Sequence, residues 1–169
     1  MTEKKFALLT IRKIKNRGTL TGAMRHNTRL QPQEHFDPAR EHLNFYGASL
    51  DEVMKLYEQR LPSKVRKNAI HVVECIVSGS ESKLLRVDYK AFFRDSVEWL
   101  VNKLGGSQNT LGHFIHQDED ISHLHVLIMP LMDGKLCYSR FLGGSRYQLN
   151  QLQTDFAKEV AAAYGLERG

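Results

Sequence analysis

The sequence predicts an α+β domain in which a central antiparallel β-sheet is flanked by helices. Two observations carry this prediction. Strand-like and helix-like segments are mixed along the chain, and two of the strands are joined by a connection that is too short for a crossover. The length of 169 residues, with no linker or repeat, suits one domain. We therefore expect residues 1–169 to fold as a single domain.

The first third of the chain begins with a strand. Residues 4–15 alternate imperfectly between apolar and polar side chains, which predicts a strand closed by an Asn-Arg-Gly turn at residues 16–18. Residues 19–29 have the pattern of a short helix. Residues 31–48 contain two prolines and no steady apolar period, so we expect a long surface loop, and loops of this length are often functional.

The middle of the chain gives the clearest helix signal. The run Ser49-Leu-Asp-Glu52 is a capping box, which predicts a helix over residues 50–61. Residues 70–77 are rich in β-branched side chains and predict a strand. Residues 88–104 predict an amphipathic helix that stops at a glycine.

The last third begins with a predicted β-hairpin. Residues 110–117 and 122–131 form its two strands, separated by a short acidic connection. The Met-Asp-Gly-Lys turn at residues 132–135 leads to a further short strand. Residues 148–164 predict a closing helix with Gly165 as its C-cap.

Composition excludes several classes of protein. The chain is 41% hydrophobic and 25% charged, and its two cysteines, Cys75 and Cys137, are far apart and suit a reducing compartment. It has no signal-peptide pattern and no apolar run near the ~20 residues of a membrane span. We therefore exclude secreted, membrane-spanning, collagen-like and disordered proteins.

Positive charge is concentrated at the N-terminal end. Residues 1–29 contain eight basic side chains and one acidic one, whereas the other 140 residues have a net charge of −2. Such a segment would attract a polyanion such as nucleic acid. The alternative is an ordinary solvated basic face.

Four of the eight histidines lie within thirteen residues. His123 and His125 are two apart on a predicted strand, so their side chains leave the same face, and the hairpin brings His116 beside them. Three imidazoles on one face could hold a divalent ion with open positions for substrate. His113 has the opposite parity, and we expect it to be structural. The alternative for the His-x-His pair is a structural or partly exposed role.

A second histidine, His26, lies between Arg25 and Arg29 in the basic segment. Neighbouring cations disfavour its protonated form, so a neutral imidazole that can act as a nucleophile is expected near pH 7. The alternative is a histidine that only stacks or hydrogen-bonds at a helix end.

These motifs together resemble the Pre/Mob (MobV-type) relaxases, which nick plasmid DNA at an origin of transfer. The resemblance covers most of the chain. It is carried by His26-Asn-Thr-Arg29, Arg40-Glu-His-Leu-Asn44, the run from His116 to His125 with the apolar strand to Pro130, and the closing Leu166-Glu-Arg-Gly169. The third block is the most specific.

The resemblance implies a histidine-hydrophobe-histidine endonuclease fold, a metal held by His116, His123 and His125, and His26 as nucleophile. Mn²⁺ or Mg²⁺ is the expected ion, and Zn²⁺, Ni²⁺ or Co²⁺ could occupy the site in a crystal. The chain departs from the family pattern at Ser122, where proline is common. It also has Phe45 after Asn44, which moves the tyrosine to Tyr46 and leaves Tyr46 as an alternative nucleophile.

We expect Glu119 to orient or deprotonate His26, with Asp118 as the weaker candidate, and Arg29 to add positive charge at the phosphate. The expected partner is single-stranded origin DNA beside a hairpin. The residues expected to contact it are Lys13, Lys15, Arg17, Arg25, Asn27, Asn44 and Tyr46.

Two other functions fit the same residues: a metal-dependent phosphodiesterase that forms no covalent intermediate, and a basic single-stranded-DNA-binding domain without catalysis. The closing motif leads us to expect the N-terminal part of a longer bacterial cytoplasmic protein, in which any oligomerisation region lies beyond Gly169.

Overall fold

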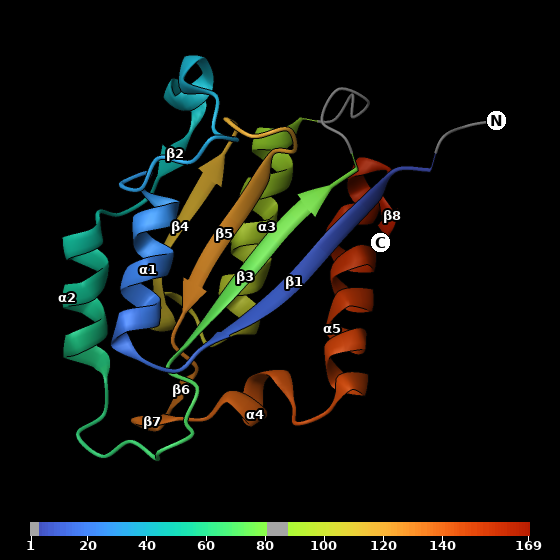
Figure 1. The fold of residues 1–169 in the computed structure, drawn as a ribbon. Helices are drawn as coiled ribbons and strands as arrows, with labels where there is room; N and C mark the ends of the chain where they lie inside the picture. The colour runs from blue at the N-terminus through green and yellow to red at the C-terminus, as the bar shows by residue number, and fades with distance from the viewer. Residues whose placement is uncertain (1–3, 81–87) are drawn as a thin grey trace.

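The structure is a computed structural model, and it describes residues 4–80 and 88–169. A six-stranded sheet with the strand order β2-β4-β5-β3-β1-β8 forms its centre (Figure 1). All neighbouring strands in it are antiparallel except β1 and β8. The strands are β1 (Phe6–Ile14), β2 (Phe45–Tyr46), β3 (Val72–Gly79), β4 (Thr110–His116), β5 (His123–Ile128) and β8 (Glu167–Arg168).

Helices cover both faces of this sheet. One core cluster joins the sheet to α3 and α5, and a second joins the opposite face to α1 and α2 (Figure 1). The predicted class, an antiparallel sheet flanked by helices, is confirmed. The α-helices are α1 (Arg17–Asn27), α2 (Leu50–Arg60), α3 (Tyr89–Lys103), α4 (Tyr138–Leu142) and α5 (Arg146–Glu159).

The predicted hairpin of β4 and β5 determines where the histidines lie. Leu124, Val126 and Ile128 of β5 pack into the core cluster with α3 and α5. Because side chains alternate along a strand, His123 and His125 leave the opposite face, beside α1. The expected division of β5 into an apolar face and a histidine face is confirmed.

The predicted turn at residues 16–18 is wrong, because Asn16 is the N-cap of α1. Its side chain accepts a hydrogen bond of 2.8 Å from the backbone N–H of Thr19, so the helix already begins at Arg17. The predicted C-terminal end at Arg29 is also wrong, because the helix stops at Asn27.

Residues 31–48 are not one irregular loop. A 3₁₀ helix occupies Pro38–Leu43, capped by the Asp37 side chain, and β2 then pairs with β4 through Phe45↔Ile115 and Tyr46↔Phe114. Two-residue strands give no alternation that a sequence pattern can show, which explains the error.

The C-terminal helix also differs from the prediction of residues 148–164. Ser145 and Gln148 form a capping box that starts α5 at Arg146, and the helix ends at Glu159. A separate 3₁₀ helix, Ala161–Tyr164, follows, and Gly165 caps it with a φ of 69°. The prediction missed the short helix α4. The Met-Asp-Gly-Lys turn is confirmed and joins the small strands β6 (Leu131–Met132) and β7 (Lys135–Leu136).

Two further predictions from local sequence are confirmed. The capping box at Ser49 is formed at the start of α2, and α3 packs its buried face against the sheet.

Within residues 4–80 and 88–169, no helix has both the length and the apolar character that crossing a membrane requires.

Candidate active site

The end of α1 places His26 over the sheet. Leu30 N–H donates to the Arg25 carbonyl at 2.9 Å and Arg29 N–H donates to the His26 carbonyl at 3.1 Å, which is the Schellman pattern. Arg29 has a φ of 58°, in the left-handed region where glycine usually ends such a motif. Another interaction must therefore hold an arginine in this position.

Buried ion pairs hold Arg29. Its Nε and Nη2 donate to the two carboxylate oxygens of Asp118 at 3.0 and 2.6 Å, and Nη2 also donates to Glu119 Oε2 at 2.7 Å. Its guanidinium lies 3.6 Å from the ring centroid of Phe36. These contacts tie the end of α1, and with it His26, to the connection between β4 and β5.

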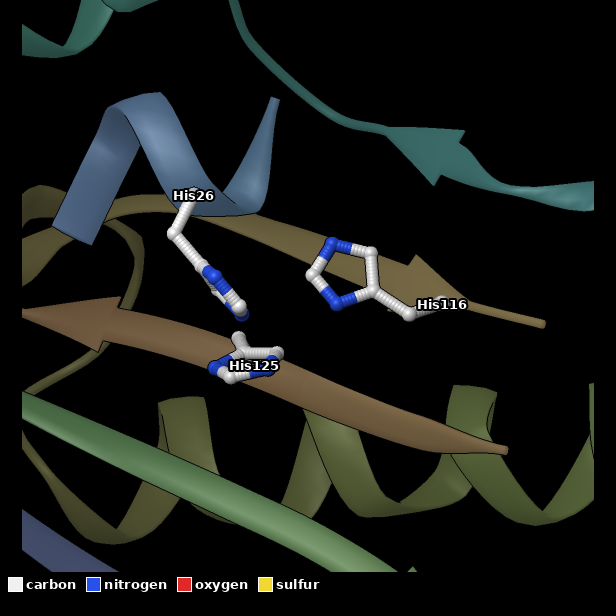
Figure 2. A group of neighbouring side chains, drawn as sticks. All are labelled: His26, His116 and His125. Atoms are coloured by element: carbon white, nitrogen blue, oxygen red, sulfur yellow. The ribbon is translucent and has the colours of Figure 1, made fainter. Parts of the chain in front are cut away.

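The three histidines of the hairpin converge. His116 pairs with His123 across the two strands, and His125 follows two residues later on the same face. The ring centroids of His116, His123 and His125 lie 4.9 to 5.0 Å apart. The ring of His26 lies 5.9 Å from His116 and 6.2 Å from His125 (Figure 2). The four rings form the histidine cluster of this site.

Hydrogen bonds to carbonyl oxygens fix the rings of His116 and His123. His116 Nε2 lies 2.8 Å from the carbonyl oxygen of Asn27, and His123 Nδ1 lies 2.8 Å from that of Ile121. A carbonyl can only accept, so His116 Nε2 carries a proton and His116 Nδ1 has the lone pair. His123 Nε2 lies 3.2 Å from His116 Nδ1 and also 3.2 Å from Glu119 Oε2. These three atoms could hold one cation between them.

A buried carboxylate fixes the third ring. Glu74, 1% exposed on β3, accepts from His125 Nδ1 at 2.8 Å and from Asn27 Nδ2 at 3.1 Å. His125 Nε2 is then buried with no hydrogen-bond partner among the described atoms, which is the state of a ligand awaiting a metal ion. The sequence analysis missed Glu74. An acidic residue within the buried run Val72–Val77 was the available signal.

The possible metal-ligating atoms form two overlapping sets. In one, the atoms of His26, His116 and His125 all lie within 4.8 Å of one another, and in the other the same holds for His116, Glu119 and His123. His116 belongs to both sets. Each set therefore offers three donors within reach of one ion, and the expected trio of His116, His123 and His125 is divided between the two sets.

Burial sets the protonation states of the cluster. It lowers the pKa of His26, and the charge of Arg29 lowers it further, which agrees with the neutral imidazole predicted from the sequence. Burial also lowers the pKa of His116 to about 3. Burial alone would raise the pKa of Glu119, but hydrogen bonds from His123 and Arg29 hold it well below its usual range. The site thus contains neutral imidazoles beside an ionised carboxylate.

Comparison with known proteins gives the family. A family model described as plasmid recombination enzyme (Mob/Pre) matches residues 3–169. The chain belongs to this family. It is 28% identical over 181 residues to plasmid recombination enzyme type 1 of Staphylococcus aureus, and 26% identical over 168 residues to a plasmid recombination enzyme of Streptococcus agalactiae. These matches cover 96% and 90% of this chain but 44% and 33% of the relatives, so the chain spans less than half of their length.

Solved structures support the fold of this Mob/Pre domain. Manganese-bound structures of the MobM relaxase domain, in complex with oriT DNA of plasmid pMV158, superpose with TM-scores of 0.83 and 0.80. They are 24% and 23% identical in sequence, and each match covers 97% of this chain and 90% of the other. The likeness establishes a shared architecture.

Three residues that were expected to touch DNA have partners within the Mob/Pre domain. Asn27 is buried and bonds Glu74 and His116. Asn44 Oδ1 accepts from the backbone N–H of Gln117 at 2.6 Å, and its amide lies 3.3 Å from the hydroxyl of Tyr46. The ring of Tyr46 lies 6.5 Å from that of His116. The structure therefore brings Tyr46 to the site and gives the two asparagines positioning contacts.

The four expected cationic DNA contacts lie at the protein surface. Lys13, Lys15, Arg17 and Arg25 are all exposed. Arg17 is paired with Glu58 at 2.9 Å, and the Lys13 ammonium lies 5.0 Å from the ring centroid of Tyr138. These side chains remain available to a polyanion, because exposed ion pairs are weak.

Proposed function

We propose that this chain is the nicking and joining domain of a plasmid relaxase, which cleaves one DNA strand at an origin of transfer and rejoins it. Family membership and the architecture shared with the MobM relaxase domain support the proposal. The substrate is single-stranded origin DNA beside a hairpin, bound in the bacterial cytoplasm. The exposed cations Lys13, Lys15, Arg17 and Arg25 would contact its phosphates.

In this proposal His116, His123 and His125 would hold a divalent cation, Mn²⁺ or Mg²⁺. In each ring one nitrogen lies against an oxygen acceptor, and the other nitrogen would be the ligand to the ion. When bound, the ion would neutralise negative charge on the nonbridging oxygens of a phosphate. Glu74 orients His125, and Glu119 adds a carboxylate beside His123.

The single observation that carries the proposal is the place of His26. Its ring centroid lies 5.9 Å from that of His116 and 6.2 Å from that of His125, although it comes from a helix about ninety residues earlier in the chain. The neutral ring has a lone pair, which forms a bond to phosphorus while the bond from phosphorus to the 3′-oxygen breaks. The 3′-oxygen takes a proton from solvent, and the half-buried ring releases its N–H proton to solvent. The product is a phosphoramidate between His26 and the 5′-phosphate.

In this proposal, Arg29 and Glu119 support the reaction without reacting themselves. Arg29 is already paired with two carboxylates, so it holds the end of α1 in place and contributes little net charge at the phosphate. The lowered pKa of Glu119 makes it a weak proton acceptor, but its charge favours the cationic ring that forms during attack. Both assignments differ from the roles expected from the sequence.

Tyr46 is the competing nucleophile, because its ring lies 6.5 Å from that of His116. Burial raises the pKa of Tyr46 and disfavours the phenolate, whereas burial lowers the pKa of His26 and favours its reactive form. The protonation states therefore favour His26.

A covalent-trapping experiment tests the proposal. A labelled single strand carrying the origin of the chain's own plasmid is incubated with Mn²⁺, and protein-linked DNA is measured after denaturation. We expect a covalent product with the wild type and with Tyr46→Phe, and none with His26→Ala, which should still bind the strand. Cleavage without any protein-linked DNA would indicate a phosphodiesterase. The absence of cleavage with every divalent ion would indicate a binding domain.

A further inference from the structure

A hollow of about 500 Å³ opens beside the histidine cluster, between the end of α1, strand β2 and the start of α2. This size lies within the range of about 300–1,000 Å³ that is typical of small-molecule sites. Thr28 and Leu30 line it on one side, and Tyr46 and Leu50 line it on another. The hollow is thus a preformed cavity with an aromatic ring and two leucines in its walls.

Two of its walls are large apolar side chains that remain unusually exposed. Leu30 is 59% exposed and Tyr46 is 37% exposed. Each of them therefore leaves more than a third of its surface open to solvent at the hollow. A flat, partly apolar ligand would bury both, and an unstacked nucleobase has this shape.

The charge of the hollow excludes a phosphate. Asp51 and Glu52 line it, and none of its described lining residues is a lysine, arginine or histidine. At the start of α2 the Glu52 carboxylate already accepts from the backbone N–H of Ser49 at 3.3 Å, so its negative charge opposes an anion there. A phosphate would be repelled, whereas a neutral base would not.

Asp51 can recognise such a base. Its side chain is exposed at the hollow, and no ion pair or side-chain hydrogen bond joins it to another residue in the part of the chain that the structure describes. A carboxylate accepts hydrogen bonds from the exocyclic amino groups of cytosine, adenine and guanine. Thymine has no amino group, and its single ring N–H lies between two carbonyl oxygens that would approach the carboxylate.

The hollow adjoins the catalytic residues. Tyr46 forms one of its walls and has its ring 6.5 Å from that of His116, while Thr28 and Leu30 follow His26 by two and four residues. A base in the hollow would belong to a nucleotide close to the phosphate that is cut.

We propose that this hollow holds one unstacked base of the bound single strand, next to the scissile phosphate, and that Asp51 selects a base with an exocyclic amino group over thymine. This inference rests on the proposed function for the identity of the strand. It adds a specificity-determining residue, Asp51, and an apolar contact, Leu30, that the sequence motifs did not indicate.

Binding measurements without chemistry test it. The whole 169-residue chain is titrated, in EDTA, into fluorescein-labelled dC15, dA15 and dT15, and fluorescence anisotropy gives each Kd. We expect dC15 and dA15 to bind at least about fivefold more tightly than dT15. Asp51→Asn should bring the three values close together. Glu98→Gln, which removes an exposed acid on α3, should leave the wild-type ratios unchanged and so controls for net charge.

A leucine pair gives a second readout that does not depend on the charge change. Leu30→Ala should weaken binding of all three strands, whereas Leu43→Ala removes a leucine of similar exposure, 46%, outside the hollow and should change nothing. Equal effects of the two leucine variants, or ratios that Asp51→Asn leaves intact, would overturn the inference. Thermal melting of each variant confirms folding. A wrong assignment of His26 would leave these binding ratios unaffected, so the two proposals fail separately.

Discussion

Glu74 and Glu119 are both carboxylates beside the histidine cluster, but they come from different kinds of structure. Glu74 is buried in the middle of β3 and accepts hydrogen bonds from His125 and Asn27. Glu119 lies in the connection between β4 and β5 and contacts Arg29, His123 and the exposed His35. The strand carboxylate fixes one ring rigidly, whereas the loop carboxylate joins several partners at the edge of the site.

This difference shows how the cluster is divided between rigid and adaptable parts. The sheet fixes the orientation of the His125 ring. Ile76 of β3 pairs with His125, and Glu74, two residues before Ile76, lies on the same face of the sheet. The loop determines His123 and the end of α1 through ion pairs. Removing Glu74 and removing Glu119 should therefore have different effects on the protein.

The largest effects are expected at Glu74 and Arg29. Glu74→Ala would leave a buried imidazole N–H and a buried amide without an acceptor, so we expect the free energy of unfolding to fall by about 3–5 kcal/mol. Glu74→Gln, which keeps the volume, should lower Mn²⁺ affinity by about 10–100-fold. Urea unfolding and calorimetric Mn²⁺ titration measure the two quantities. A Glu119→Gln variant that loses as much stability as Glu74→Ala would contradict the proposed division.

A second pair of variants, at Arg29, tests the ion pairs with the connection between β4 and β5. Arg29→Ala removes the partner of two carboxylates, and we expect a loss of about 3–5 kcal/mol in unfolding free energy. Arg29→Gly loses the same ion pairs but relieves the left-handed backbone, so it should be more stable than Arg29→Ala by about 1 kcal/mol. Equal stability of the two variants would show that the backbone at this position carries no strain.

Metal binding gives an intermediate effect. An ion present at 100 times its Kd should stabilise the folded wild type by about 2.7 kcal/mol. At that same Mn²⁺ concentration, Glu74→Gln should show a clearly smaller rise in Tm. Differential scanning calorimetry with and without EDTA measures it, and Mg²⁺ provides a parallel series. An unchanged Tm in the wild type at saturating Mn²⁺ would argue against a metal site.

The smallest effect is expected at His35, the exposed partner of Glu119. Its Nε2 lies 3.1 Å from Glu119 Oε1, with the side chain 56% exposed. Exposed ion pairs contribute little, so His35→Ala should change stability by less than about 1 kcal/mol. Urea midpoints at neutral pH would show this. A larger loss would mean that the loop carboxylate depends on all of its partners.

Local signals predicted much of this molecule. The capping box at Ser49, the apolar period of α3 and the alternation around His123 all lie within one element, so the sequence pattern was enough to predict them. The hairpin connection was also short enough to bring His116 to its partners. These predictions needed no knowledge of how distant segments pair.

Contacts between segments that are distant in the sequence could not be predicted in this way. Glu74 reaches His125 only through the register of β3 with β5, which no sequence spacing reveals. The ion pair of Arg29 with Asp118, a contact across 89 residues, was likewise absent from the sequence prediction, which expected Arg29 to add positive charge at the phosphate. The two-residue strand β2 and the helix α4 are too short to show a period. The errors therefore concern tertiary contacts and very short elements.

The left-handed residue that ends α1 makes the three-residue interval between His26 and Arg29 a geometric constraint. An α-helix turns by about 100° per residue, so one inserted residue would rotate the imidazole away from the sheet while the guanidinium stayed anchored. A deletion would have the reverse effect. Chain length in this short stretch is therefore less free to vary than the identity of the residues within it.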